Sequence, residues 1–556
     1  MTKAQSRKDT DLYFLPLGGT GEIGMNLNLY RYKGRWLMVD LGVTFDSESA
    51  PGCDVIMPDI TFIEAEKSRL DGLVLTHAHE DHLGAVEYLW HRLRCPIYAT
   101  PFTAAVLKRK LAENEGQRSF PPINIVPLSA RFHVGPFDLE LISLTHSIPE
   151  PNAIAIRTDA GTILHTGDWK IDPNPLVGEN MDIDRLRELG QEGVLALVGD
   201  STNALVDGHS GSEAELRDSL VSVVEGCKGR VAVACFASNV ARLETMSVVA
   251  QKVGRRAALV GRSMWRMYAA AREVGYLRDI PDFITEEEAG YFPRDSILMV
   301  CTGSQGESRA ALSRIASGGH PHVTLERGDT VIFSSRMIPG NEKSINALHN
   351  RLASLGIEIV TDNDAFVHVS GHPCRDELTA MYQWVRPRIA VPVHGEKRHL
   401  IAHSELALAC QVSSAPVLAN GQVLRLSGDQ PIVVDEVHVG RLVVDGNRVV
   451  SLKDEGLQQR RRLMHNGAAV ATIVLNRLGQ LKAKPVISFL GVSDTENDLS
   501  THHTVAVEVQ QAIEGSDPNK LKDDDAVIEI TRRVVRRFAR EQNGKKPPVE
   551  VHVIRL

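Results

Sequence analysis

Residues 77–82 have the sequence HAHEDH, directly after the apolar segment LDGLVLT. That segment is typical of a buried strand, and a helix is expected to begin near Asp81. Ligand-type side chains this close together cannot all bind one ion in a closed tetrahedral site, but they can serve two neighbouring ions. One loop supplies too few ligands for two ions. The fold is therefore expected to bring further histidines and aspartates to this loop from the ends of other strands.

Candidates of this kind follow other strand-like segments. They are His146 after LISLT, Asp168 after TILHTG and His394 after RIAVPV. Asp40, which follows RWLMV, is placed to orient a ligand histidine by a hydrogen bond. A single histidine or aspartate at a strand end more often caps the backbone, so these residues are assigned only as a set with HAHEDH. His91 and His165 have no such support and are left out of the set.

The bulk composition limits the class of protein. The formal net charge is −8, which argues against a densely basic surface for nucleic acid, although a pair of bound cations would add local positive charge. Seven cysteines without a CxxC pair indicate reduced thiols. The apolar run from Leu12 to Leu17 is too short for a signal peptide or a membrane span. We therefore expect a cytoplasmic protein without a membrane segment.

The pattern of strands and helices changes along the chain. Short strands and turns prevail to about residue 200, longer strand–helix alternation follows, and a small α/β tail ends the chain. The predicted parts are a first domain in two pieces (1–211 and 387–455), an inserted parallel α/β domain (212–386), a basic linker (456–467) and a C-terminal α/β domain (468–556).

HAHEDH resembles the HxHxDH signature of the metallo-β-lactamase superfamily. The resemblance implies an αββα sandwich and a centre with two divalent metal ions, zinc in the first instance, with manganese or magnesium as alternatives. It implies that one ion is held by His77, His79 and His146, the other by Asp81, His82 and His394, and that Asp168 bridges them. Two such ions can lower the pKa of a water between them and neutralise charge on a phosphorane-like transition state.

Three further motifs resemble motifs A, B and C of the β-CASP nucleases. They are Asp200 in LVGDSTN, His372 in HVSGH and His394 in VPVHGE. Asp200 alone would equally fit an Asx turn or a helix N-cap. By resemblance, Asp200 holds His372 as the protonated group that donates to the leaving 3′ oxygen. The implied catalytic residues are Asp81, Asp168, Asp200 and His372.

Within that group the chain resembles the ribonuclease J family over nearly its whole length, in motifs such as PLGGTGEIGMN and FASNVARL. FASN at a strand-to-helix turn presents backbone N–H groups and a hydroxyl, which suit an anion, although an ordinary turn would have the same pattern. In the family such a pocket receives the 5′-monophosphate of RNA. The residues predicted to form it are Phe236, Ala237, Ser238 and Asn239, with His368, Val369, Ser370, Gly371 and His372 opposite.

The resemblance implies a ribonuclease with 5′-to-3′ exonuclease and endonuclease activity on single-stranded RNA, a preference for 5′-monophosphate ends, and roles in mRNA decay and rRNA maturation. It also implies a homodimer or homotetramer, assisted by the C-terminal domain, and partners in RNA degradation. Three alternatives remain: a DNA-directed β-CASP nuclease, a small-molecule metallohydrolase, and an RNA-binding scaffold without catalysis. The arginine-rich segment 532–540 fits a solvated helix face better than an RNA-binding strip.

Overall fold

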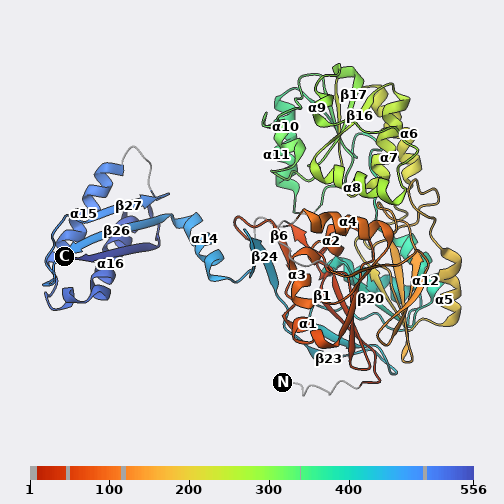
Figure 1. Cartoon of the computed structure of the whole chain (residues 1–556), viewed down its shortest axis with the longest axis horizontal. Coiled ribbons are helices and arrows are strands. Elements are labelled where there is room, and N and C mark those ends of the chain that lie inside the picture. The colour runs from red at the N-terminus through yellow and green to blue at the C-terminus, as the bar shows by residue number, and fades with distance from the viewer. Residues whose placement is uncertain (1–8, 46–49, 114–120, 339, 493–497) are drawn as a thin grey trace. The chain divides into compact units, whose positions relative to one another are not determined.

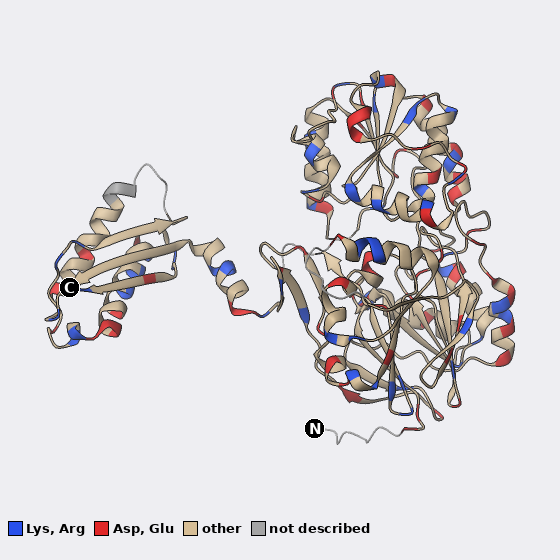
Figure 2. Cartoon of the chain, in the orientation of Figure 1, with Lys and Arg blue, Asp and Glu red and all other residues tan. Residues whose placement is uncertain are grey.

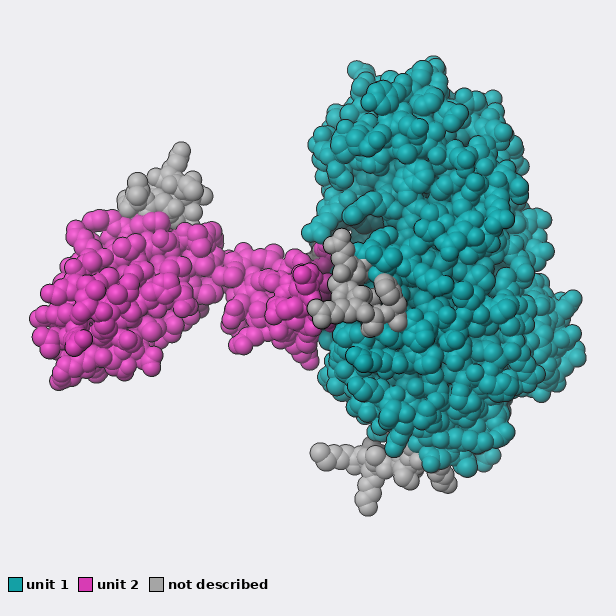
Figure 3. Space-filling model, in the orientation of Figure 1, with its two compact units in different colours: residues 1–45, 55–442 teal, residues 46–54, 443–556 magenta. Residues whose placement is uncertain are grey.

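The computed structural model describes residues 9–45, 50–113, 121–338, 340–492 and 498–556 (Figure 1). The chain divides into two compact units, shown in different colours in Figure 3. The first consists of residues 1–45 and 55–442, and the second of residues 46–54 and 443–556.

Two β-sheets form the main body of the first unit. In spatial order, the larger sheet contains β23 (Ile432–Glu436), β22 (Gln422–Arg425), β1 (Tyr13–Gly18), β3 (Leu27–Tyr32), β4 (Arg35–Val39), β7 (Leu70–Val74), β8 (Ile97–Ala99) and β9 (Ile123–Ile125). The smaller sheet contains β10 (Arg131–Val134), β11 (Phe137–Ser143), β12 (Asn152–Thr158), β13 (Gly161–His165), β14 (Ala196–Asp200) and β20 (Ile389–Val393). Short strands outside these sheets are β2 (Thr20–Gly21), β5 (Thr44–Phe45), β6 (Val55–Pro58) and β21 (Gly395–Glu396).

The two sheets pack face to face through one apolar core. Phe14 and Leu37 of the larger sheet lie in the same buried cluster as Leu139, Ile154 and Ile163 of the smaller one. A second cluster packs helices against the other face of the smaller sheet, and helices also lie against the larger sheet. The helices are α5 (Ile183–Glu192), α12 (Arg375–Val385) and α13 (Lys397–Ala409) on one side, and α1 (Thr61–Ala65), α3 (Val86–Leu93) and α4 (Pro101–Ala112) on the other. The predicted αββα sandwich is therefore confirmed.

Parallel pairing explains why polar residues gather at one edge of this sandwich. In the smaller sheet β13, β14 and β20 are mutually parallel neighbours, and Asp200 stands opposite Val393 in the ladder. In the larger sheet β4 and β7 are also parallel, with Val39 opposite Val74. Because parallel strands end at the same edge of a sheet, the residues that follow these strands are brought together.

The inserted domain is a five-stranded parallel sheet. Its strands, in spatial order, are β16 (Arg256–Val260), β17 (Ile297–Cys301), β15 (Val231–Ala234), β18 (Thr330–Phe333) and β19 (Glu358–Val360). Its helices are α6 (Glu213–Glu225), α7 (Val240–Lys252), α8 (Arg262–Val274), α9 (Glu286–Ala289), α10 (Ala311–Ala316) and α11 (Glu342–Ser354). The predicted doubly wound insert is present. Its central strand, β15, is followed by Cys235 and then by Phe236.

Ion pairs join the insert to the sandwich along α4 and α8. Arg109 pairs with Glu273 at 2.6 Å, and Arg266 pairs with Glu113 at 2.8 Å. In the view of Figure 2, basic and acidic residues are interspersed along the ribbon of the first unit.

The second unit has its own sheet and core. Its main elements are α14 (Glu455–Asn466), β26 (Ala468–Leu475), β27 (Val486–Leu490), α15 (Asp498–Glu514), α16 (Asp524–Asn543) and β28 (Val549–Arg555). β26 is central, antiparallel to β27 and parallel to β28. The basic segment predicted as a linker is an α-helix in the structure, because Asp454 caps its first turn. The boundaries proposed for the individual domains stay a prediction.

All seven cysteines lie among the described residues, and each is a free thiol. Among the described helices, none is both long enough and apolar enough to cross a lipid bilayer.

Candidate metal centre

The HAHEDH loop is held in place by the segment that follows β4. Leu41 donates its backbone N–H to the carbonyl of His82 at 2.7 Å, and Val43 donates to that of Glu80 at 3.0 Å. A Cβ atom on Gly42 would lie 1.7 Å from the carbonyl oxygen of Asp81, so only glycine permits this approach. The loop then enters the one-turn helix α2 (Glu80–Leu83). The backbone that carries these ligand-type side chains is thus held by contacts with residues 41–43.

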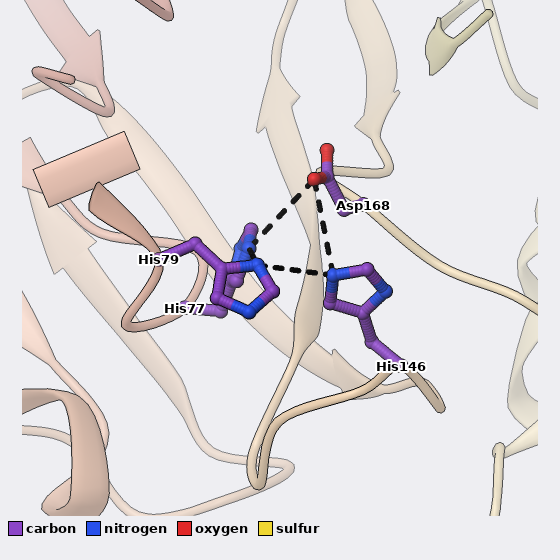
Figure 4. Close-up of side chains that lie close together, drawn as sticks. All are labelled: His77, His79, His146 and Asp168. Carbon is purple, nitrogen blue, oxygen red and sulfur yellow. Dashed lines mark hydrogen bonds and ion pairs between the residues drawn. The ribbon is translucent and has the colours of Figure 1, made fainter. Parts of the chain in front are cut away.

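Four side chains from three segments form the first group of possible ligands (Figure 4). These are His77, His79, His146 and Asp168, each with one ligand atom within 4.8 Å of the others. The Nδ1 atom of His79 lies 3.0 Å from His77 Nε2 and 3.1 Å from His146 Nε2. Asp168 Oδ2 lies 3.8 Å from His77 Nε2 and 3.9 Å from His146 Nε2.

The second group shares Asp168 with the first. It consists of Asp81, His82, Asp168 and His394. The same Oδ2 atom of Asp168 lies 3.2 Å from His82 Nε2 and 3.6 Å from His394 Nε2. Asp81 Oδ2 lies 3.5 Å from His82 Nε2 and 3.7 Å from His394 Nε2. One carboxylate oxygen therefore faces both sets of imidazoles.

The neutral state of the histidines and the presence of unpaired buried polar atoms both suit a site that binds cations. Burial lowers the pKa of His77 and His146 well below the usual range and that of His79 to about 4, so these imidazoles carry free lone pairs. Two buried atoms of the candidate ligands, Asp168 Oδ1 and His394 Nε2, have no hydrogen-bond partner among the described residues. Buried polar atoms are rarely left unpaired. Nitrogen and carboxylate donors of this kind suit borderline divalent metals.

Neighbouring side chains orient these candidate ligands. Asp40 Oδ2 lies 2.7 Å from His82 Nδ1, and its carboxylate also accepts hydrogen bonds from the backbone and hydroxyl of Thr76. The Nε2 atom of His82 is thereby directed at the centre. Asn26 takes the equivalent position beside His394, with Oδ1 3.0 Å from His394 Nδ1. Sequence reasoning did not single out Asn26, although it ends the glycine-rich motif PLGGTGEIGMN.

His165 is buried behind the centre. Its Nδ1 atom lies 2.8 Å from the hydroxyl of Tyr30, and burial lowers the pKa of the imidazole to about 4. It lines the same small cavity as Asp40 and Asp168 but belongs to none of the groups of possible ligands among the described residues.

Asp200 and His372 form a pair beside the second group. Asp200 Oδ2 lies 2.8 Å from His372 Nδ1, and its other oxygen accepts from the backbone N–H of Thr202. Burial alone would lower the pKa of His372, but Asp200 outweighs it and the pKa rises to about 9. His372 Nδ1 is also 3.9 Å from Asp168 Oδ2. His372 is thus a protonated imidazole at neutral pH, and it lies next to the carboxylate of Asp168.

Arg242 links the two segments predicted to bind phosphate. Phe236, Ala237 and Ser238 are half-buried after β15, and Asn239 caps α7 by accepting from the N–H of Arg242. The Arg242 guanidinium in turn donates to the carbonyl of Val367, the residue before His368. In the second segment Val369 is buried, and Ser370 accepts hydrogen bonds from Asn203 and from the N–H of His372. The far end of that segment reaches the centre, where Gly371 accepts from His146 Nδ1.

Comparisons with protein families match consecutive parts of the chain. The metallo-β-lactamase superfamily matches residues 24–225, and the ribonuclease J β-CASP domain matches residues 228–352. A domain described as the Zn-dependent metallo-hydrolase RNA specificity domain matches residues 356–410, and the ribonuclease J C-terminal domain matches residues 456–556.

Curated relatives are similar over nearly the full length. Ribonuclease J of Sinorhizobium meliloti is 45% identical over 99% of this chain and 98% of its own length. Ribonuclease J of Mycolicibacterium smegmatis is 37% identical over 97% of this chain and 96% of its own length. A crystal structure of a protein of unknown function from Enterococcus faecalis covers 75% of this chain and all of that chain, with a TM-score of 0.52 and 15% identity, which shows a similar fold alone.

Proposed function

Since this chain belongs to the ribonuclease J family and is a metal-dependent phosphodiesterase of the nuclease class, we propose that it hydrolyses single-stranded RNA from the 5′ end. We also propose endonucleolytic cleavage, roles in mRNA decay and rRNA maturation, assembly as a homodimer or homotetramer, and partners in RNA degradation. The observation that carries the proposal is the single oxygen of Asp168 that faces two sets of imidazoles, with the Asp200–His372 pair beside it.

The proposed centre holds two divalent ions, zinc in the first instance. His77, His79 and His146 would hold one ion, Asp81, His82 and His394 the other, and Asp168 would contact both. Such ions supply Lewis acidity that activates a water and offsets the charge of the phosphate. The protein's own part is to keep the imidazoles neutral by burial and to aim them through Asp40, Asn26 and the carbonyl of Gly371.

His372 is the proposed general acid. Protonation of the leaving 3′ oxygen lets the phosphodiester bond break without forming a free alkoxide. The carboxylate of Asp200 holds the proton on His372 at neutral pH and is itself fixed by the N–H and hydroxyl of Thr202. His372 follows Ser370 by two residues, and its Nδ1 atom lies 3.9 Å from Asp168 Oδ2.

The pocket formed by residues 236–239 and 368–372 is the proposed site of the RNA 5′-monophosphate. Its support is the half-buried loop between β15 and α7, together with the hydroxyls of Ser238 and Ser370. The buried Nδ1 atom of His368 has no hydrogen-bond partner among the described residues, and burial lowers the pKa of that imidazole to about 3. Binding of the 5′ end here would place a nearby phosphodiester bond at the centre and favour stepwise removal of nucleotides.

The proposal predicts which substrate is cut. The purified protein with Mn²⁺, Mg²⁺ or Zn²⁺ should release mononucleotides from 5′-monophosphorylated RNA faster than from 5′-triphosphorylated RNA or matched single-stranded DNA. Asp81→Ala should reduce this cleavage by roughly a hundredfold or more, because a metal ligand is lost. Product analysis on gels and metal content by mass spectrometry are the measurements. Equal cleavage of DNA would favour a DNA-directed nuclease, and normal activity of Asp81→Ala would refute the role of that residue.

A second prediction concerns the pocket. Ser238→Ala should lower the preference for 5′-monophosphate over 5′-hydroxyl RNA, by roughly tenfold, because one hydrogen bond to a charged group is lost. Ser354→Ala is the control, since this serine is exposed at the end of α11 and bonds only its own helix. The ratio of kcat/KM for the two RNAs is measured. An unchanged ratio in Ser238→Ala would remove Ser238 from the pocket.

A further inference from the structure

We propose that four buried charged side chains, Lys170, Asp172, Glu213 and Arg242, set the position of the phosphate pocket relative to the metal centre. They are positioning residues: none of their side chains bonds to a proposed metal ligand, and Arg242 acts on the pocket through Asn239 and Val367. The inference rests on the proposed function, because it explains how the phosphate pocket and the metal centre act on one RNA strand.

At the metal end, the chain of charges begins two residues after Asp168. Lys170 Nζ pairs with Asp172 at 3.1 Å and donates to the carbonyl of Gly211 at 3.0 Å. Asp172 accepts from the hydroxyl of Ser212 at 2.7 Å and from the N–H of Glu213 at 3.1 Å. Lys170 is 1% exposed and Asp172 is 5% exposed. The segment that carries Asp168 is therefore tied to the first turn of α6.

At the pocket end, Glu213 accepts from Arg242 Nη2 at 3.2 Å through each carboxylate oxygen. Arg242 Nη1 donates to the carbonyl of Ser334 at 3.0 Å, to the Ser334 hydroxyl, and to the carbonyl of Val367 at 3.4 Å. Its backbone N–H donates to Asn239 Oδ1 at 2.8 Å. One guanidinium, fully buried, thus contacts the backbone just before His368 and lies one turn from the FASN segment.

A fifth buried residue, Glu377, bonds to the segments on both sides of the inserted domain. Glu377, which is 0% exposed, accepts from the N–H of Ile171 at 2.8 Å and from that of Cys374 at 2.7 Å. It also accepts from the N–H and hydroxyl of Ser210. Residues 210–213 and 367–374 are the segments through which the chain enters and leaves the inserted domain. The first of these segments therefore bonds directly to Lys170 and Asp172, just after Asp168. The second is linked to Ile171 through Glu377.

The energetics favour a positioning role over simple helix packing. Removing charges from water costs several kcal/mol for each ion, and apolar side chains could join α6 to α7 at no such cost. The same two helices are also joined by Arg217 and Glu244, a pair that is partly exposed and does not reach Val367 or Ser334. That second pair provides a matched control on the same helices.

The test compares Glu213→Gln with Glu244→Gln in the full chain. The preference for 5′-monophosphate over 5′-hydroxyl RNA should fall roughly tenfold or more in Glu213→Gln, because a shift of about 1 Å is enough to misplace a bound strand. The loss should appear mainly in KM for the 5′-monophosphorylated RNA. Metal content should be unchanged, and Glu244→Gln should behave as the unaltered protein does.

A double variant separates positioning from stability. Glu213→Gln with Arg242→Met removes both buried charges, so it should recover thermal stability relative to Glu213→Gln, yet it lacks the contacts to Ser334 and Val367. Persistent loss of the 5′ preference in the double variant supports the inference, and recovery overturns it. Equal losses in Glu213→Gln and Glu244→Gln would also overturn it. An unchanged preference in Glu213→Gln, with a reduced one in Ser238→Ala, overturns the inference alone; if Ser238→Ala is unchanged too, the proposed pocket fails as well.

Discussion

Gly371 shows how much a single small residue constrains this centre. Its carbonyl oxygen accepts from Nδ1 of His146, which leaves Nε2 of that histidine facing His79 and Asp168. A Cβ atom on Gly371 would lie 2.6 Å from Cε1 of His146, closer than such atoms approach. The predicted pocket segment is therefore also a support for a predicted metal ligand. At Gly371 an added Cβ atom would collide with the side chain of His146, whereas at Gly42 it would collide with the backbone of Asp81.

Gly371→Ala should displace His146 and weaken the first group of ligands. We expect metal affinity to fall by about 10- to 100-fold, the usual effect of losing a residue that orients a ligand. Zinc competition with a chromogenic chelator measures it, and Gly226→Ala is the control because a Cβ there meets only ordinary contacts at 3.5 Å. Unaltered zinc affinity in Gly371→Ala would show that His146 does not bind the metal.

At the scale of secondary structure, three elements meet behind Asp200. Ser201 follows β14, Tyr382 lies on α12 and His403 lies on α13. His403 Nδ1 is 2.8 Å from the Ser201 hydroxyl, and its Nε2 is 2.8 Å from the Tyr382 hydroxyl. All three side chains are buried, and burial lowers the pKa of His403 to about 4, so it bridges them as a neutral imidazole. The bridge fixes the end of β14, from which Asp200 reaches His372.

Tyr382→Phe should destabilise the first unit by about 1–3 kcal/mol, because a buried ring nitrogen of His403 loses its partner. Urea unfolding followed by fluorescence measures the change. Tyr291→Phe serves for comparison, since Tyr291 is 91% exposed. If the two variants unfold at the same urea concentration, the hydroxyl of Tyr382 contributes nothing to stability.

On the scale of the whole molecule, the centre depends on a chain that leaves the sandwich and returns to it. Asp200 stands at the end of β14, the inserted domain follows, and β20 then pairs with β14 in parallel and delivers His394. Every residue of the candidate centre, from Asn26 to His394, belongs to the first compact unit. The second unit supplies none of these groups from its described residues.

A chain that ends at Asp454 should therefore keep its metal content and its hydrolysis of a short phosphodiester. If the C-terminal domain assists assembly, as we propose, the truncated chain should sediment as a smaller species than the full chain. Metal analysis and analytical ultracentrifugation are the two measurements. A truncated chain that folds but binds no metal would contradict the assignment of the centre to the first unit.

Much of this protein could be predicted from local patterns. HAHEDH after a buried strand, with His146, Asp168 and His394 at other strand ends, indicated a group of candidate metal ligands, because ligand types and strand periodicity are properties of short segments. The αββα sandwich was implied by the family resemblance that HAHEDH carries. The alternation of strands and helices likewise indicated the parallel insert. These features need only residue type and spacing.

The remaining features arise from contacts between residues far apart in the chain, which periodicity does not encode. The support of His394 by Asn26 joins residues 368 positions apart, and the buried contact of Arg242 with Val367 joins residues 125 positions apart. Side chains such as Arg242 are polar in the sequence and buried in the fold, because their charges are paired only once the segments have come together.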